Sequence, residues 1–176
     1  MKLVLLILLL FVPLLVRADE PRYTESFTSP NGKYVFRSKP NIQGDKNWIL
    51  IEKDTKKVLY EFDESFGYFT VLVSNDGKNL VAIDDYSIRK SEDDPEVLRF
   101  FVDGKEVKAY KLSEVLETPQ RVKQTVSHFL WIKKPFPLTI SDSKLAFTTY
   151  EQSNFVFNIN TGEILKKEKG TSPKPN

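Results

Sequence analysis

The stretch Ser74-Asn75-Asp76-Gly77-Lys78-Asn79-Leu80-Val81-Ala82-Ile83-Asp84-Asp85 indicates the fold, because weaker copies of its first half occur on both sides of it in the chain. Its Asn-Asp-Gly segment supplies residues that tolerate a positive φ in a tight turn. Residues 80–83 form a short apolar run with the length and composition of a strand. The stretch therefore predicts a turn that leads directly into a β-strand.

Two other segments share this turn pattern. Ser29-Pro30-Asn31-Gly32-Lys33 has the same Ser, Gly and Lys and precedes an apolar strand, and Ser141-Asp142-Ser143-Lys144 is a third copy without the glycine. Ser29 and Ser74 lie 45 residues apart, within the roughly 40–50 residues of a four-stranded propeller blade. The spacing predicts three propeller-like sheets, the first either complete or one strand short. The alternative is that unrelated hairpins share a common turn sequence.

The rest of the chain supplies further strand pairs. Residues 48–51 and 58–60 flank a turn at 54–57, and residues 98–102 run into the hairpin turn Asp103-Gly104-Lys105. The other expected strands are residues 23–28, 66–73, 107–112, 145–150, 155–159 and 164–165.

An insertion separates the second and third copies of the turn. Ser74 and Ser141 are 67 residues apart, 22 more than the first spacing. We expect the extra residues at 113–128, where a segment that starts at Ser113 and stops before Pro119 has typical boundaries of one or two helical turns. The predicted fold class is all-β: antiparallel β-meanders that resemble three blades of a partial or open β-propeller, with one short helical insertion.

The N-terminus has the features of a secretory signal peptide. Lys2 precedes an apolar run over residues 3–16, and Val16-Arg17-Ala18 provides a cleavage site before Asp19. An uncleaved membrane anchor is the alternative, but the run is shorter than the roughly 20 residues that cross a bilayer. We expect a signal peptide at residues 1–18, which would place the protein in the periplasm or outside the cell, without an integral membrane segment after cleavage.

The remaining chain is expected to form one domain over residues 19–168, followed by a disordered tail at 169–176, with irregular, lysine-rich chain from Lys166 onwards. Cleavage would remove Lys2 and Arg17 and leave 24 basic residues against 24 acidic ones. A neutral exported domain gives no reason to expect nucleic acid as a partner. The chain has no cysteine, so packing alone has to stabilise it.

Four segments follow one another in a characteristic order: Val71-Leu72-Val73-Ser74-Asn75-Asp76-Gly77-Lys78, Phe101-Val102-Asp103-Gly104-Lys105, Tyr110-Lys111-Leu112-Ser113-Glu114-Val115-Leu116 and Val126-Ser127-His128-Phe129-Leu130-Trp131. In this order the chain resembles a group of uncharacterised exported bacterial proteins with β-propeller-like repeats of the WD/YVTN type. The resemblance covers about residues 66–165 and implies a propeller-like fold. Its motifs are turn and strand signatures, so it implies no catalytic residue.

His128 is the only histidine, so any histidine-based acid, base or metal role falls on it. Ser127 is a candidate nucleophile, but neighbours on a strand point to opposite faces, whereas a nucleophile and its base have to converge. The sequence also lacks the common hydrolase, zinc-protease, phosphate-loop and dinucleotide motifs. We expect no catalytic residue and no cofactor, and keep a hydrolase with a loop-built site at His128 as an alternative.

Acidic residues gather in the loop over residues 84–96, from Asp84 to Glu96. Calcium prefers several oxygen ligands, which such a cluster could supply. The alternating spacing of an EF-hand loop is absent, and Arg89 and Lys90 offset the negative charge. We expect a solvated loop without a metal, and keep a calcium-dependent surface protein as a second alternative.

Aromatic residues in the strands are expected to fill the core. Trp131, close to the break Pro135-Phe136-Pro137, is expected at an exposed edge. Three blades fall short of the about four to eight of a closed ring, so open strand edges are candidates for pairing with a partner or a second copy. The sequence favours an exported, non-enzymatic interaction or scaffold domain for an unknown protein partner. The candidate interaction residues are His128, Phe129, Trp131 and Phe136.

Overall fold

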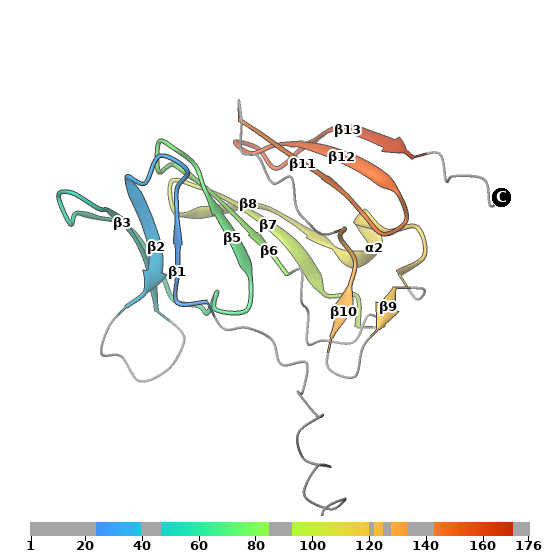
Figure 1. The fold of residues 1–176 in the computed structure, drawn as a ribbon, viewed down its shortest axis with the longest axis horizontal. Helices are drawn as coiled ribbons and strands as arrows, with labels where there is room; N and C mark the ends of the chain where they lie inside the picture. The colour runs from blue at the N-terminus through green and yellow to red at the C-terminus, as the bar shows by residue number, and fades with distance from the viewer. Residues whose placement is uncertain are drawn as a thin grey trace, which may run out of the picture.

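The structure, a computed structural model, describes residues 24–39, 47–84, 93–119, 122–124, 128–133 and 143–170. Three antiparallel sheets follow one another in sequence order and lie next to each other across the molecule (Figure 1). A short strand pair and one helix come between the second and third sheets in the chain. The predicted all-β fold of three propeller-like sheets with a short helical insertion is confirmed.

The first sheet contains four strands in the order β1-β2-β3-β4. Its strands are β1 (Ser26–Thr28), β2 (Tyr34–Ser38), β3 (Trp48–Glu52) and β4 (Val58–Phe62). Each strand pairs with the next one along the chain, as in a meander. This sheet is therefore complete, and the option of a missing strand does not apply to it.

The second sheet has the same architecture, in the order β5-β6-β7-β8. Its strands are β5 (Thr70–Val73), β6 (Asn79–Ile83), β7 (Glu96–Val102) and β8 (Lys105–Lys111). Every residue of β6 is buried. A strand that is covered on both faces has no polar face, which explains why its sequence is a continuous apolar run without alternation.

The third sheet has three named strands, β11 (Lys144–Thr148), β12 (Ser153–Asn158) and β13 (Ile164–Lys169). Before it, β9 (Lys123–Gln124) pairs with β10 (Phe129–Leu130). Just after β10, Ile132 forms a bridge with Thr149, and the Lys133 amide donates to the Thr148 carbonyl at 2.9 Å. Residues 131–133 therefore add a short strand beside β11, in the position that β1 and β5 occupy in the first two sheets.

The helix α2 (Leu112–Val115) follows β8 directly and turns its two buried residues, Leu112 and Val115, into the protein. It overlaps the predicted insertion, and the short helix predicted there is confirmed, but its N-cap is Lys111 rather than Ser113. The sequence did not predict β9, which occupies the same insertion.

Two hydrophobic cores separate the three sheets. The first lies between the first and second sheets and contains Phe36, Trp48, Leu50, Phe62, Phe66, Val71, Val73, Leu80, Ala82 and Phe101. The second joins the second and third sheets and the helix, and includes Val81, Ile83, Leu98, Phe100, Leu112, Phe129, Trp131, Leu145, Phe147, Phe155 and Phe157. Because alternate residues of β6 enter different cores, the middle sheet is packed on both faces.

Polar contacts also join the sheets. The Tyr60 hydroxyl of β4 donates to the Asp103 carboxylate in the β7–β8 turn at 2.9 Å, and the Tyr110 hydroxyl of β8 donates to the Gly162 carbonyl in the β12–β13 turn at 2.7 Å. Each tyrosine lies on the last strand of one sheet and contacts the last turn of the next. The same connection is therefore used at both junctions.

The first two copies of the turn make the same hydrogen bonds. The Ser29 hydroxyl donates to Asn31 Oδ1 at 2.8 Å and accepts the Tyr34 amide at 3.0 Å. In the second copy, the Ser74 hydroxyl donates to Asp76 Oδ1 at 2.6 Å and accepts the Asn79 amide at 2.9 Å. The two turns therefore repeat the same pair of hydrogen bonds, as a true sequence repeat predicts. Unrelated hairpins would have no reason to share this pair.

These two turns also bind each other. The Asn31 amide donates to Asn75 Oδ1 at 2.8 Å, and Asn31 Nδ2 donates to the Asn75 carbonyl at 2.7 Å. At the glycine position of the second turn, φ is +71°, and a Cβ at Gly77 would lie 2.7 Å from the ring of Tyr34. Gly77 is therefore required both by the backbone conformation and by the approach of the first sheet.

In the third copy of the turn, a residue other than glycine has a positive φ. Ser143 occupies the corresponding position with φ of +61°. A residue with a Cβ pays a steric cost in this region that glycine does not. Ser143 therefore adopts the backbone region of the glycine at a steric cost.

Two expectations about the strands are wrong. Residues 66–69 do not extend β5: they form a turn in which the Phe69 amide donates to the Phe66 carbonyl at 3.0 Å, because Phe66 is drawn into the first core. Residues 166–169 are not irregular but belong to β13, which pairs with β12. The Lys167 ammonium lies 5.1 Å from the centre of the Phe155 ring, so a lysine-rich segment can cover an aromatic core.

Candidate functional site

The two ends of the sheets differ in their connections. The tight turns β1–β2, β3–β4, β5–β6 and β7–β8 connect adjacent antiparallel strands and lie at one end. The opposite end carries the longer connections, including the one that contains α2 and β9. Because loops on a rigid sheet scaffold commonly carry recognition residues, the end with the long connections is the better place to look for a site.

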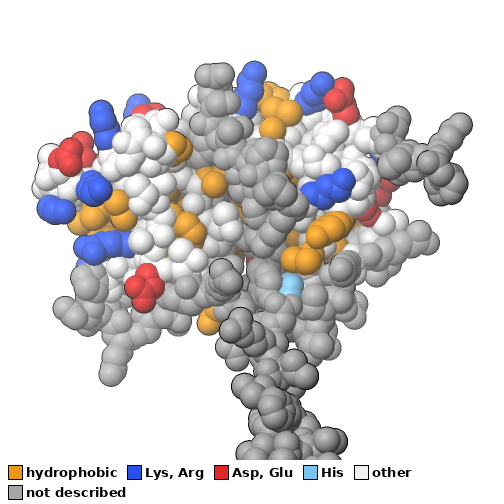
Figure 2. All heavy atoms as spheres, viewed as in Figure 1, with side chains coloured by type: hydrophobic (Ala, Val, Ile, Leu, Met, Phe, Trp, Pro, Cys, Tyr) orange, Lys and Arg blue, Asp and Glu red, His pale blue; other side chains and the backbone are white. Residues whose placement is uncertain are grey.

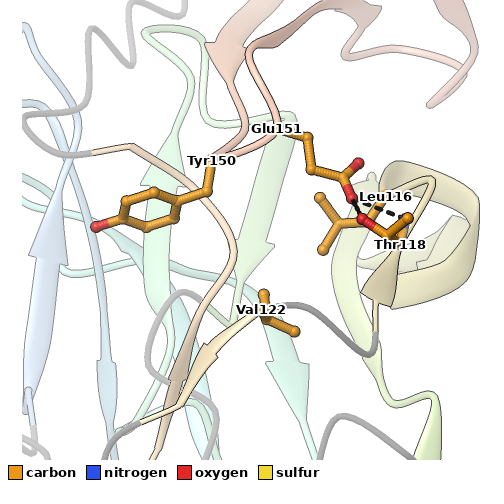
Figure 3. Close-up of a pocket in the computed structure, with 5 residues that line it drawn as sticks. All are labelled: Leu116, Thr118, Val122, Tyr150 and Glu151. Carbon is orange, nitrogen blue, oxygen red and sulfur yellow. Dashed lines mark hydrogen bonds between the residues drawn. The ribbon is translucent and has the colours of Figure 1, made fainter. Parts of the chain in front are cut away.

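A small pocket lies at this end, between the segment after α2 and the turn between β11 and β12 (Figure 3). It has a volume of about 100 Å³ and is lined by Leu116, Thr118, Val122, Tyr150 and Glu151. Tyr150 and Glu151 are neighbours in the sequence, and Figure 3 shows their side chains pointing in opposite directions, with Glu151 toward Thr118. Apolar and acidic groups therefore share a single depression.

Glu151 fixes one wall of this pocket. Its carboxylate accepts the backbone amides of Glu117 and Thr118, both at 2.7 Å, and also the Thr118 hydroxyl. These bonds attach the segment after α2 to the third sheet. A further hydrogen bond, from Lys169 Nζ of β13 to Glu117 Oε2 at 2.7 Å, reinforces the attachment.

The same bonds change the acidity of Glu151. Burial, the largest single influence, would raise its pKa, but the hydrogen bonds from Thr118 and from two backbone amides, together with the positive charge of Lys169, lower the pKa below the ordinary value of 4.5. The carboxylate is thus stabilised in its charged form. Its bonds are structural, and they give it no orientation as a catalytic acid.

Tyr150 forms the exposed side of the pocket. Its side chain is 40% exposed, while its amide donates to the Trp131 carbonyl at 3.0 Å and holds the turn against residues 131–133. A tyrosine with a fixed backbone and a free aromatic face can contact a partner at a small entropic cost. The sequence offered no signal for either Tyr150 or Glu151, because they follow a strand without any motif.

Three of the four predicted interaction residues are described, and none of them lines this pocket. His128, Phe129 and Trp131 are buried, so the expected exposure of Trp131 is wrong. Trp131 has no exposed surface, and its indole nitrogen donates to the Asp84 carbonyl at 2.6 Å, which satisfies its polar atom inside the second core. Phe136 lies outside the described residues. Interaction through this segment stays a prediction. Because three of its four residues are buried, the neighbouring Tyr150 is the more accessible aromatic residue.

The other sequence-derived candidates fall largely outside the described residues. These include the signal peptide with Ala18, residue Ser127, the middle of the acidic loop and the end of the tail. At the loop's two ends, Asp84 is buried and Glu96 begins β7. Within the described ranges, no group of three or more His, Asp or Glu side chains is arranged to hold a metal, and no helix is long and apolar enough to cross a membrane.

Comparison with known proteins supports the fold. A structure of a eukaryotic initiation factor is similar with a TM-score of 0.51 and 13% identity, over 85% of this chain and 35% of that one. The β-propeller domain of Cps50 (Swd1) from Myceliophteria thermophila has a TM-score of 0.44 at 13% identity, over 85% and 41% of the two chains. The RRP9 WD40 repeats have a TM-score of 0.42 at 11% identity, over 88% and 40%.

This chain therefore spans less than half the length of the solved structures that it matches. No protein-family model matches the sequence, and no curated protein does. At 13% identity, the similarity to the initiation-factor structure concerns the fold alone.

Proposed function

We propose that this protein is an exported, non-enzymatic scaffold that binds another protein at the end with the long connections, around the pocket at Tyr150. The observation that carries the proposal is the pocket itself, because its size and lining suit one side chain of a protein partner. Pockets for small molecules commonly measure roughly 300–1,000 Å³, whereas this pocket has about 100 Å³.

The chemistry of the pocket supports the same conclusion. The Glu151 carboxylate is occupied by three hydrogen bonds from residues 117 and 118. Leu116 and Val122 add apolar surface, and Tyr150 provides an aromatic contact of the type that dominates protein interfaces. A partner would therefore gain affinity from burying its side chain against Tyr150.

A binding measurement with matched tyrosine variants tests this function. The mature protein, immobilised by its C-terminus, captures partners from an envelope fraction, and the captured proteins are quantified by mass spectrometry. We expect Tyr150→Ala to reduce the recovery of the main partner about tenfold, the loss typical of an interface tyrosine. Tyr68→Ala is the control, because Tyr68 is 42% exposed in the connection between the first two sheets.

The outcomes separate clearly. Equal recovery by wild type and Tyr150→Ala would contradict binding at the pocket. Equal losses with Tyr150→Ala and Tyr68→Ala would contradict it as well, since the effect would then not be local. Export is tested separately by the intact mass of the protein from its native host, which should begin at Asp19; a mass that includes Met1 would contradict cleavage after Ala18.

A further inference from the structure

The face of the first sheet that points away from the second sheet carries a distinct pattern. Phe36, Leu50 and Phe62 enter the first core, so their strand neighbours Arg37, Ile49 and Glu61 point to the opposite face. The register places Arg37 opposite Ile49, and Ile49 opposite Glu61. One row across three strands therefore runs from a positive residue through an apolar residue to a negative one.

The next row on this face is apolar across β2, β3 and β4 and ends at Thr28 of β1. Val35 pairs with Ile51, and Ile51 pairs with Val58. Ile49 and Ile51 are only 5% and 8% exposed, although neither belongs to one of the two cores, and Val58 is 43% exposed. Figure 2 shows hydrophobic side chains between Lys and Arg side chains at the end of the molecule that the first sheet forms.

The corresponding face of the third sheet is different. There the polar cross-strand pairs Lys144 with Asn158, Thr148 with Asn154, and Asn154 with Glu168 surround one small apolar pair, Ala146 with Val156, which Lys166 flanks. Such a face is already complementary to water, so it is a poor surface for stacking against the apolar rows of the first sheet. Head-to-tail contact between two copies, with the third sheet of one against the first sheet of the other, is therefore disfavoured.

We propose that the outer face of the first sheet binds the same face of a second copy, around a two-fold axis that runs along β3. Such an axis places β2 of one copy over β4 of the other and leaves β3 over β3. Arg37 then faces Glu61 of the other copy in both directions, and Val35 faces Val58. The two rows are self-complementary, as a closed dimer with two-fold symmetry requires.

Ile49 and Ile51 are nearly covered within one copy, so the contacts in this arrangement come from the exposed groups beside them, Arg37, Glu61 and Val58. Glu61 forms an ion pair with Lys39 at 3.1 Å, but its side chain is still 60% exposed, so it can accept a second cation. Arg37 is exposed. Two β-sheets can stack face to face at about 10 Å with their strands nearly aligned, which matches the orientation that the two-fold axis imposes.

Sedimentation equilibrium of the mature protein over a range of concentrations tests the proposal through charge reversal. We expect wild type to dimerise reversibly, and Arg37→Glu and Glu61→Arg to weaken the dimer about tenfold or more each, because symmetry places two pairs of like charges in contact. The double variant Arg37→Glu/Glu61→Arg should restore the wild-type dissociation constant within about threefold, since it exchanges the two charges.

Two controls keep the result specific. Lys166→Glu reverses a charge on the third sheet and should leave self-association unchanged, and Tyr150→Ala should do the same because the pocket lies on another part of the molecule. Unchanged near-ultraviolet circular dichroism shows that each variant is folded. A monomeric wild type, single reversals without effect, or a double variant that stays as weak as the single ones would each overturn the two-fold dimer.

Discussion

The outer faces of the first and third sheets are built in opposite ways. Both sheets are meanders that pack one face against the middle sheet. The first sheet places Val35, Ile49 and Ile51 on its other face, whereas the third sheet places Lys144, Thr148 and other polar residues there. The comparison shows that equivalent sheets of one fold can differ in their outer faces: buried isoleucines form the centre of one face, and mainly polar residues form the other.

The largest expected effect comes from Phe157 of β12 in the third sheet, and its neighbour Val156 is the matched control. Phe157→Ala should destabilise the protein by about 3–5 kcal/mol, because Phe157 is fully buried and packs against two rings. The centre of its ring lies 5.4 Å from the ring centres of both Phe100 and Tyr110. Val156→Ala should cost less than about 1 kcal/mol, because Val156 is half-buried on the polar face. Chemical denaturation measures both free energies of unfolding.

The first sheet supplies the matching pair. Leu50→Ala and Ile49→Ala should each cost about 2–5 kcal/mol, because both residues are buried although they point to opposite faces. A small loss of unfolding free energy for Ile49→Ala, similar to that of Val156→Ala, would contradict the difference between the two outer faces.

Arg99 tests the junction of the first two sheets. It donates from Nη1 to Glu64 at 2.5 Å and from Nε to Glu106 at 2.7 Å, and its guanidinium lies 4.9 Å from the centre of the Phe101 ring. We expect Arg99→Met to cost about 1–3 kcal/mol by leaving two carboxylates without their partner.

The surface ion pair of Lys166 with Glu168 on the third sheet provides the control. Lys166→Met should change the free energy of unfolding by less than about 0.5 kcal/mol, as is usual for exposed pairs. Equal losses for the two variants would show that the Arg99 contacts are no stronger than a solvated pair.

The lowered pKa of Glu151, in the third sheet, predicts that the free energy of unfolding depends on pH. Because the folded-state pKa lies below the ordinary value of 4.5, the carboxylate stabilises the fold fully above that value, and this contribution is lost as the pH falls through the lowered pKa. Glu151→Gln should cost about 1–2 kcal/mol at neutral pH and progressively less in acid. Urea unfolding of both proteins across this pH range measures the difference. A difference that does not shrink in acid would show that the charge is not responsible.

The smallest expected effect concerns the third turn. Ser143→Gly should stabilise the protein by about 0.5–1 kcal/mol, because glycine adopts a φ of +61° without a steric cost. Gly77→Ala should have the opposite effect, since its φ is +71° and the new Cβ would meet Tyr34. Thermal unfolding of the two variants measures the changes, and a loss of stability in Ser143→Gly would contradict the equivalence of the turns.

The sequence predicted what depends on local chemistry. The turn at Ser74 and its copy at Ser29 were recognisable because Ser, Asn or Asp, and Gly are the residues that bond and bend a turn. The continuous apolar run of residues 80–83 likewise indicated a strand, although only the structure shows that cores on both sides cover it. Ser113 and Pro119 predicted a short helix, which is present, but it begins at Leu112 and ends at Val115, so neither residue marks its boundary.

What depends on distant contacts could not be predicted. The sequence predicts Phe66 at the start of a long strand, and only its place in the first core explains the turn. Trp131 has charged and proline neighbours in the sequence. Its indole N–H nevertheless donates a hydrogen bond to the Asp84 carbonyl, 47 residues away, inside the protein. Glu151 follows a strand without a motif, and its role comes from the backbone of residues 117 and 118.

Native-state hydrogen exchange tests most directly the claim that a middle sheet packed on both faces holds two unequal outer sheets. The amides of β6 are paired on both sides and buried, so they should exchange most slowly, at the rate of global unfolding. The amides of β13, whose residues are all exposed, should exchange faster. Protection in β13 equal to that in β6, or fast exchange throughout β6, would contradict the account.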